Sequence, residues 1–160
     1  MSNATDAKLK VEPVGERQIR AERVFNAPRE KVYEAMTDPE LIPKWWGRRV
    51  DTTIVEEMNV EVGGRWRFVS ESEEGTHGFS GTFRELDPPA RVVQTFEWDG
   101  MPGYISVDAA DLEDLGDGRT RVVSTSTFHF AEERDGMLSS GMEIGMGETY
   151  DRLEELLAQS

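Results

Sequence analysis

The sequence predicts an α+β domain in which a curved antiparallel sheet of about seven strands wraps around a long C-terminal helix. A strand-like segment near the N-terminus leads directly into two short helical segments. The middle of the chain alternates apolar and polar residues between glycine- and proline-containing turns, which is typical of antiparallel hairpins. The last part of the chain then changes to a helical period.

The N-terminal elements follow from alternation and from helix-capping residues. Residues 18–26 alternate as a half-buried strand does. Pro28 opens a short helix, because proline suits a first helical turn. Asp38 caps a second helical turn, which Pro43 ends. One strand followed by two short helices is therefore expected.

Six further strands are expected, and none is separated from the next by a segment long enough for a crossover helix, so all pair antiparallel. They cover residues 52–57, 65–71, 78–86, 91–98, 104–112 and 120–130.

The C-terminal segment predicts a single helix of ~20–26 residues, or ~30–40 Å, laid across one face of the sheet. Its apolar residues step by three and four: Leu138, Met142, Met146, Tyr150, Leu153, Leu156 and Leu157. Residues 17–160 are expected to form one domain, and residues 1–16 a flexible N-terminal segment that begins with a possible tag remnant at residues 2–4.

Composition excludes several classes of function. The chain has 18 Lys and Arg against 32 Asp and Glu, a formal net charge of −14, which disfavours binding to nucleic acid or anionic lipid. It has no cysteine and no long apolar run, so neither thiol chemistry nor membrane insertion is expected. It also has no signal peptide, and we expect a cytoplasmic location. With only His77 and His129 available, no metal site is expected. The sequence has no phosphate-binding loop and no dinucleotide fingerprint, so no other cofactor is expected.

Aromatic residues alternate along the expected strands and are candidates to line a ligand cavity or to fill a solid core. They are Trp66, Phe68, Phe79, Phe83, Phe96, Trp98 and Phe128. Met142 and Met146 face them from the expected helix, and flexible thioethers suit an adaptable apolar pocket.

Hydroxyl and charged residues share these strands. Ser124 and Ser126 lie on the face of Phe128, so they point either into a cavity or, in the reversed register, to solvent. Arg23 is in phase with the apolar face of its strand, where it either binds a ligand carboxylate or forms an ion pair at the sheet edge. Asp108 belongs to an acidic strand, which favours a solvent-facing position over a site with a raised pKa.

Two features of the C-terminal helix leave alternatives open. Gly141, Gly145 and Gly147 indicate either close approach of helix to sheet or space for a ligand. Met137 and Ile144, seven residues apart, would form an outward apolar patch for a weak homodimer.

Four stretches of the chain resemble one known family. They are residues 23–28, 37–47, 81–95 and 141–145, within a likeness that spans residues 18–158. The sequence is similar to the activator of Hsp90 ATPase homologues (AHSA1-like), within the helix-grip, START/Bet v 1-like superfamily. That resemblance implies a container fold whose members include lipid and polyketide binders, cyclases and co-chaperone domains.

The leading hypothesis is therefore binding of a small, largely hydrophobic, oxygen-bearing molecule, lipid- or polyketide-like, between the sheet and the terminal helix. The alternatives are a co-chaperone-like contact with Hsp90 and a cofactor-free cyclase or hydrolase. Such an enzyme needs a buried ionisable group among Asp108, Tyr104 and His77.

Overall fold

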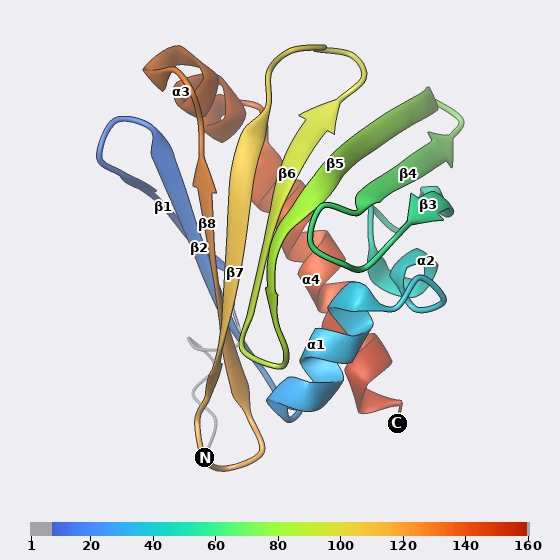
Figure 1. Cartoon of the computed structure of the whole chain (residues 1–160), viewed down its shortest axis with the longest axis vertical. Coiled ribbons are helices and arrows are strands. Elements are labelled where there is room, and N and C mark those ends of the chain that lie inside the picture. Colours follow the sequence, from blue (N-terminus) through green and yellow to red (C-terminus); the bar gives the residue numbers. More distant parts are fainter. Residues whose placement is uncertain (1–7, 160) are drawn as a thin grey trace.

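The computed structural model describes residues 8–159, which form one eight-stranded antiparallel sheet and four helices (Figure 1). The strands are β1 (Lys10–Val14), β2 (Gln18–Phe25), β3 (Thr52–Met58), β4 (Arg65–Ser72), β5 (Gly75–Asp87), β6 (Arg91–Trp98), β7 (Ser106–Asp114) and β8 (Thr120–Thr127). The helices are α1 (Arg29–Thr37), α2 (Ile42–Trp45), α3 (Ala131–Ser139) and α4 (Met142–Ala158).

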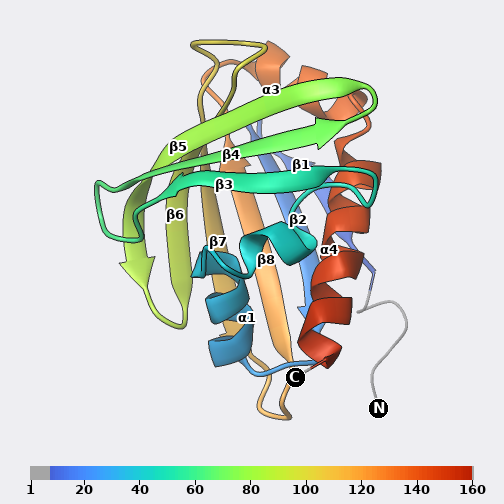
Figure 2. The same cartoon turned by 90° about the vertical axis from the view of Figure 1, so that its right-hand side faces the viewer.

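The sheet is strongly bent around α4, as the sequence predicts. Its strand order is β1-β2-β8-β7-β6-β5-β4-β3. In Figure 2, β6, β7 and β8 run along the long axis of the molecule, whereas β3 and β4 run across it, and α4 lies along one side of the concavity. Register shifts after Val55 in β3 and after Phe83 in β5 accompany this bend, since bulges increase strand curvature.

The eighth strand, β1, lies within the segment that the sequence suggested was flexible. It pairs with β2, with Val11 opposite Ala21 and Pro13 opposite Ile19. Its proline and its polar residues hide the strand pattern, and an edge strand tolerates proline because one side of it needs no partner. Residues 2–4, the possible tag remnant, lie outside the described residues.

The expected single C-terminal helix is wrong, because the chain breaks into α3 and α4 at Gly141. Gly141 has a φ of 85°, a left-handed conformation that glycine adopts without steric cost. The Ser140 hydroxyl donates a hydrogen bond to the Met137 carbonyl oxygen at 2.6 Å, which helps end α3. Met137 and Ile144 therefore lie on different helices, and the apolar patch expected on one helix is not formed.

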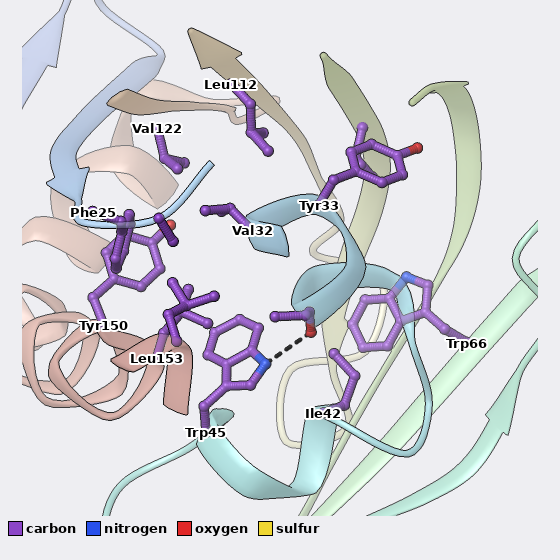
Figure 3. Packing of buried hydrophobic residues seen from close by; sticks show 14 of the residues in the cluster. Phe25, Val32, Tyr33, Ile42, Trp45, Trp66, Leu112, Val122, Tyr150 and Leu153 are labelled. Carbon is purple, nitrogen blue, oxygen red and sulfur yellow. Dashed lines mark hydrogen bonds between the residues drawn. The ribbon is translucent and has the colours of Figure 1, made fainter. Parts of the chain in front are cut away.

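The fully packed core lies where α1, α2 and the second half of α4 meet the sheet (Figure 3). Phe25, Val32 and Leu153 are completely buried there. Trp45 fills the space between the helices and donates its indole N–H to the Ala35 carbonyl oxygen at 2.9 Å. Each such apolar side chain contributes roughly 1.5–3 kcal/mol of burial free energy, so this end of the domain contributes strongly to the stability of the fold.

Polar contacts hold α4 at a fixed position over the sheet. The Arg152 guanidinium donates to the carbonyl oxygens of Gly47 at 2.9 Å and Arg48 at 3.1 Å, after α2. The Thr149 hydroxyl donates to the same Gly47 oxygen at 3.1 Å. These bonds tie the middle of α4 to the segment after α2.

Candidate functional site

The strand register determines which serines face α4. Ser124 lies opposite Ala21 on β2 and Ala110 on β7, and its hydroxyl lies 3.1 Å from the Tyr150 hydroxyl of α4. Ser126, two residues further along β8, shares this face because strand side chains alternate. Of the two alternatives for Ser124 and Ser126, the structure selects the concave face.

Asp108 also lies on the concave face, which corrects the solvent-facing position favoured by the sequence. It is opposite Ser126 on β8 and Gln94 on β6. Its acidic neighbour Asp111 is three residues away and therefore on the other face, where it pairs with Arg91 at 2.7 Å. Asp111 thus lies on the outer face of β7, whereas Asp108 lies on the concave face.

Burial is the main influence on the ionisation of Asp108. It raises the pKa of this carboxyl to about 6, because water cannot fully solvate the ionised form. Hydrogen bonds from Ser126 and Ser106 act in the opposite direction, and the Ser106 hydroxyl donates to Asp108 Oδ1 at 3.2 Å. No Lys or Arg among residues 8–159 forms an ion pair with Asp108, so its charge is not neutralised by the protein.

Tyr150 faces the same region from α4. Its side chain is buried, its ring lies edge-on to Phe25 at 5.4 Å, and its hydroxyl is paired with that of Ser124. Burial raises the pKa of Tyr150, the charge of Asp108 raises it further, and that of Arg23 lowers it. We call Ser106, Asp108, Ser124, Ser126 and Tyr150 the interior polar cluster.

Arg23 points inward from β2, but the protein itself supplies its carboxylate. Its Nη1 donates to Asp151 Oδ1 of α4 at 2.6 Å, and its guanidinium carbon lies 5.2 Å from the Phe25 ring centroid. Only Nε of this guanidinium is buried without a partner. The arrangement combines both sequence alternatives, since Arg23 is inward-facing and also ion-paired.

The structure divides the seven candidate aromatic residues into three groups. Trp66, Phe68, Phe83 and Phe128 are at most 8% exposed and belong to the packed interior. Phe79 and Phe96 are half-buried neighbours with ring centroids 5.6 Å apart, and the Trp46 ring lies edge-on to Phe79 at 5.2 Å. Trp98 lies opposite Phe79 in the register of β5 and β6, and its ring packs against His77 at 5.7 Å.

On α4, Met142 and Met146 are half-buried, and Met146 packs against the core. A Cβ placed on Gly145 or on Gly147 would meet no atom outside the helix within 4 Å. Close approach of helix to sheet therefore does not explain these two glycines. Both positions on α4 border open space.

Two hollows on the protein surface lie away from this region. One, of about 430 Å³, is lined by Val50 and the turn at Ser72–Glu74. The other, of about 530 Å³, is lined by β3, β4, β5 and the residues around Trp98, and no residue of α4 lines either hollow. Arg67 in the second hollow is already paired with Glu56 and Asp99, at 2.9 and 2.7 Å.

The comparison with protein families decides which group the chain belongs to. The model of the family described as "Activator of Hsp90 ATPase homolog 1-like protein" matches residues 26–158. The chain belongs to this family. No match was found among curated proteins.

Solved structures of similar proteins agree with this family membership. A crystal structure from Rhodobacter sphaeroides has a TM-score of 0.89 and 26% identity, and the match covers 96% of this chain and 99% of that one. A solution structure from Staphylococcus epidermidis has a TM-score of 0.81 and 26% identity, covering 94% of each chain. The AHSA1 protein of Silicibacter pomeroyi, at 22% identity and a TM-score of 0.71, covers 89% of this chain and 98% of its own, and shows the shared fold.

Within this member of the Activator of Hsp90 ATPase homolog 1-like family, the described residues contain no group of three or more side chains able to hold a metal ion. No helix in residues 8–159 is both long and apolar enough to cross a membrane. Of the three ionisable residues considered for catalysis, Tyr104 is 52% exposed and only Asp108 lies in the interior polar cluster.

Sequence reasoning favoured the wrong face for Asp108 and did not identify Tyr150 as a member of the cluster. The sequence did carry a signal for the inward position of Asp108. Asp108 and Asp111 are three positions apart, an odd number, which places the two carboxylates on opposite faces of one strand. Tyr150 was assigned to the apolar stripe of the helix, and nothing in the sequence identified Ser124 as its hydrogen-bond partner.

Proposed function

We propose that the protein binds a small, largely hydrophobic, oxygen-bearing molecule between the concave face of the sheet and the N-terminal half of α4. The observation that carries this proposal is the interior polar cluster on the concave face of the sheet. Asp108, Ser124 and Ser126 remain half-buried although they point toward α4. A buried polar group without a full set of partners costs ~1–3 kcal/mol, and a ligand with oxygen atoms would supply partners.

The proposed ligand class is lipid-like or polyketide-like. Phe79 and Phe96 would offer ring faces, and Met142 and Met146 would move aside and repack around the bound molecule. Ser124 and Ser126 would orient its oxygen atoms. Of the remaining candidates, Trp66, Phe68, Phe83, Phe128 and Arg23 would form the walls, whereas Trp98 lines the separate hollow beside His77.

Native mass spectrometry of the full chain against fatty acids and aromatic polyketides tests the proposal. Met146→Phe adds volume to the proposed site and is expected to abolish the complex. Ile144→Phe adds a similar volume two residues earlier on α4, at a side chain that is 82% exposed, and should bind as the wild type does. Equal binding by both folded variants would contradict the proposed location.

A second candidate is a cofactor-free cyclase or hydrolase, because Asp108 meets the requirement for an ionisable group in the interior. In that role Asp108 would accept a proton from the bound molecule. Product formation that Asp108→Asn abolishes, while the substrate still binds, would favour catalysis over binding alone.

The family description names a third candidate, an Hsp90 co-chaperone-like interaction. Stimulation of Hsp90 ATPase turnover by the purified chain would support it, and unchanged turnover would exclude this candidate.

A further inference from the structure

We infer that Asp108 anchors a ligand hydroxyl, so that the bound molecule is an uncharged ring compound that donates a hydrogen bond from a phenol or enol. This inference rests on the proposed function and narrows the ligand class. It comes from the partners that Asp108 has and from those that it lacks.

The protein leaves part of the hydrogen-bonding capacity of Asp108 unused. A carboxylate accepts about four hydrogen bonds on its two oxygens. Ser106 donates one to Oδ1 at 3.2 Å, and Ser126 supplies another. Both donors are neutral hydroxyls from the flanking positions of the sheet, and the side chain is still half-buried rather than sealed. A donor on a ligand would complete the set.

The charge of Asp108 also restricts what can bind. Other carboxylates of the molecule have arginine partners, among them Asp51, Asp99 and Asp111. Arg23, which faces inward from β2, is already paired with Asp151. A ligand carboxylate placed beside Asp108 would therefore meet a like charge without a free cation, which disfavours fatty acids relative to neutral hydroxylated molecules.

The neighbouring residues indicate that the donor is attached to a ring system. Phe96 lies opposite Ser106, on the strand beside Asp108 and two residues from Gln94, the residue opposite Asp108. Strand and residue spacings place Phe96 and Asp108 roughly 8 Å apart at their Cα atoms. Fused rings stacked on Phe96 and Phe79 would thus present an edge hydroxyl to the carboxylate.

Two matched probes test the inference on the full chain. The compound 2-naphthol carries a donor hydroxyl, and 2-methoxynaphthalene has the same rings and oxygen without the donor. A hydrogen bond to a charged group predicts that wild type binds 2-naphthol at least ~10-fold more tightly. Asp108→Asn keeps a neutral amide oxygen as an acceptor and should lower that preference several-fold. Asp108→Leu has no acceptor and should remove it. Asp111→Asn, on the outer face of the same strand, should keep it.

The outcomes separate the inference from the proposed function. If wild type binds neither probe, the inference is overturned, and the proposed function is then decided by the native mass spectrometry of fatty acids and aromatic polyketides. If wild type binds both probes equally, or if the folded Asp108 variants keep the full preference for 2-naphthol, the anchor role is overturned and binding between the sheet and α4 stands.

Discussion

Replacing Asp108 by asparagine is expected to stabilise the protein at neutral pH. Burial raises the pKa of this carboxyl from 3.8 to about 6, which corresponds to an upper bound of ~3 kcal/mol by which folding disfavours the ionised form. Because the side chain is half-buried, water screens part of this cost, and we expect Asp108→Asn to add ~2 kcal/mol to the free energy of unfolding at pH 7.5.

The sign of the pH dependence follows from linkage. Between pH 3.8 and about 6 the folded state holds a proton that the unfolded state releases, so wild-type stability falls as pH rises through this window. Above it the penalty is constant, and below it both states carry the proton. The advantage of Asp108→Asn should therefore be full at pH 7.5 and nearly absent at pH 4.

Urea unfolding at these two pH values measures the effect. Asp111→Asn is the matched control, because Asp111 lies on the same strand but pairs with Arg91 at 2.7 Å on the outer face. It should gain nothing and lose at most ~1 kcal/mol at pH 7.5. The reasoning is refuted if Asp108→Asn is no more stable than wild type at pH 7.5, or if its gain is the same at pH 4.

Three further substitutions test the packing around the site by urea or thermal unfolding. Tyr150→Phe removes the hydroxyl bonded to Ser124 and should cost ~1 kcal/mol, and no change would mean that this hydrogen bond contributes nothing. Gly147→Ala places its methyl group in open space on α4 and should stabilise the protein by ~1 kcal/mol. Gly141→Ala should destabilise the protein, because Gly141 has a φ of 85°. A change of the same sign for both variants would contradict the helix break at Gly141. Trp45→Phe leaves the buried Ala35 carbonyl oxygen without its donor and should cost at least ~1–3 kcal/mol, so a smaller loss would show that water or another group replaces it.

The fold could be predicted because its elements leave periodic patterns in the sequence. Seven strands alternate between recognisable turns, and the helical stripe of α4 through Tyr150 and Leu153 has the expected spacing. β1 was missed because Pro13 and its polar neighbours conceal an edge strand. The break at Gly141 was missed because an apolar period from Leu138 continues across it, and only backbone geometry separates the two helices.

The candidate site could be predicted only in part, because its chemistry depends on contacts between distant segments. Alternation placed Ser124 and Ser126 on one face but left that face undetermined, and the contact with Tyr150 decides it. Likewise, the sequence placed Arg23 among inward residues but gave no indication that Asp151, 128 residues later, would be its partner.

Methionine methyl groups offer the most direct test of binding between the sheet and α4. The chain has seven methionines, among them Met142 and Met146 on α4 and Met101 in the exposed loop after β6. In a protein carrying ¹³C-methyl methionine, 2-naphthol should give intermolecular nuclear Overhauser effects to the methyl groups of Met142 and Met146 and none to that of Met101. Contacts restricted to Met101, or saturable binding that leaves the Met142 and Met146 methyl resonances unmoved, would contradict the account.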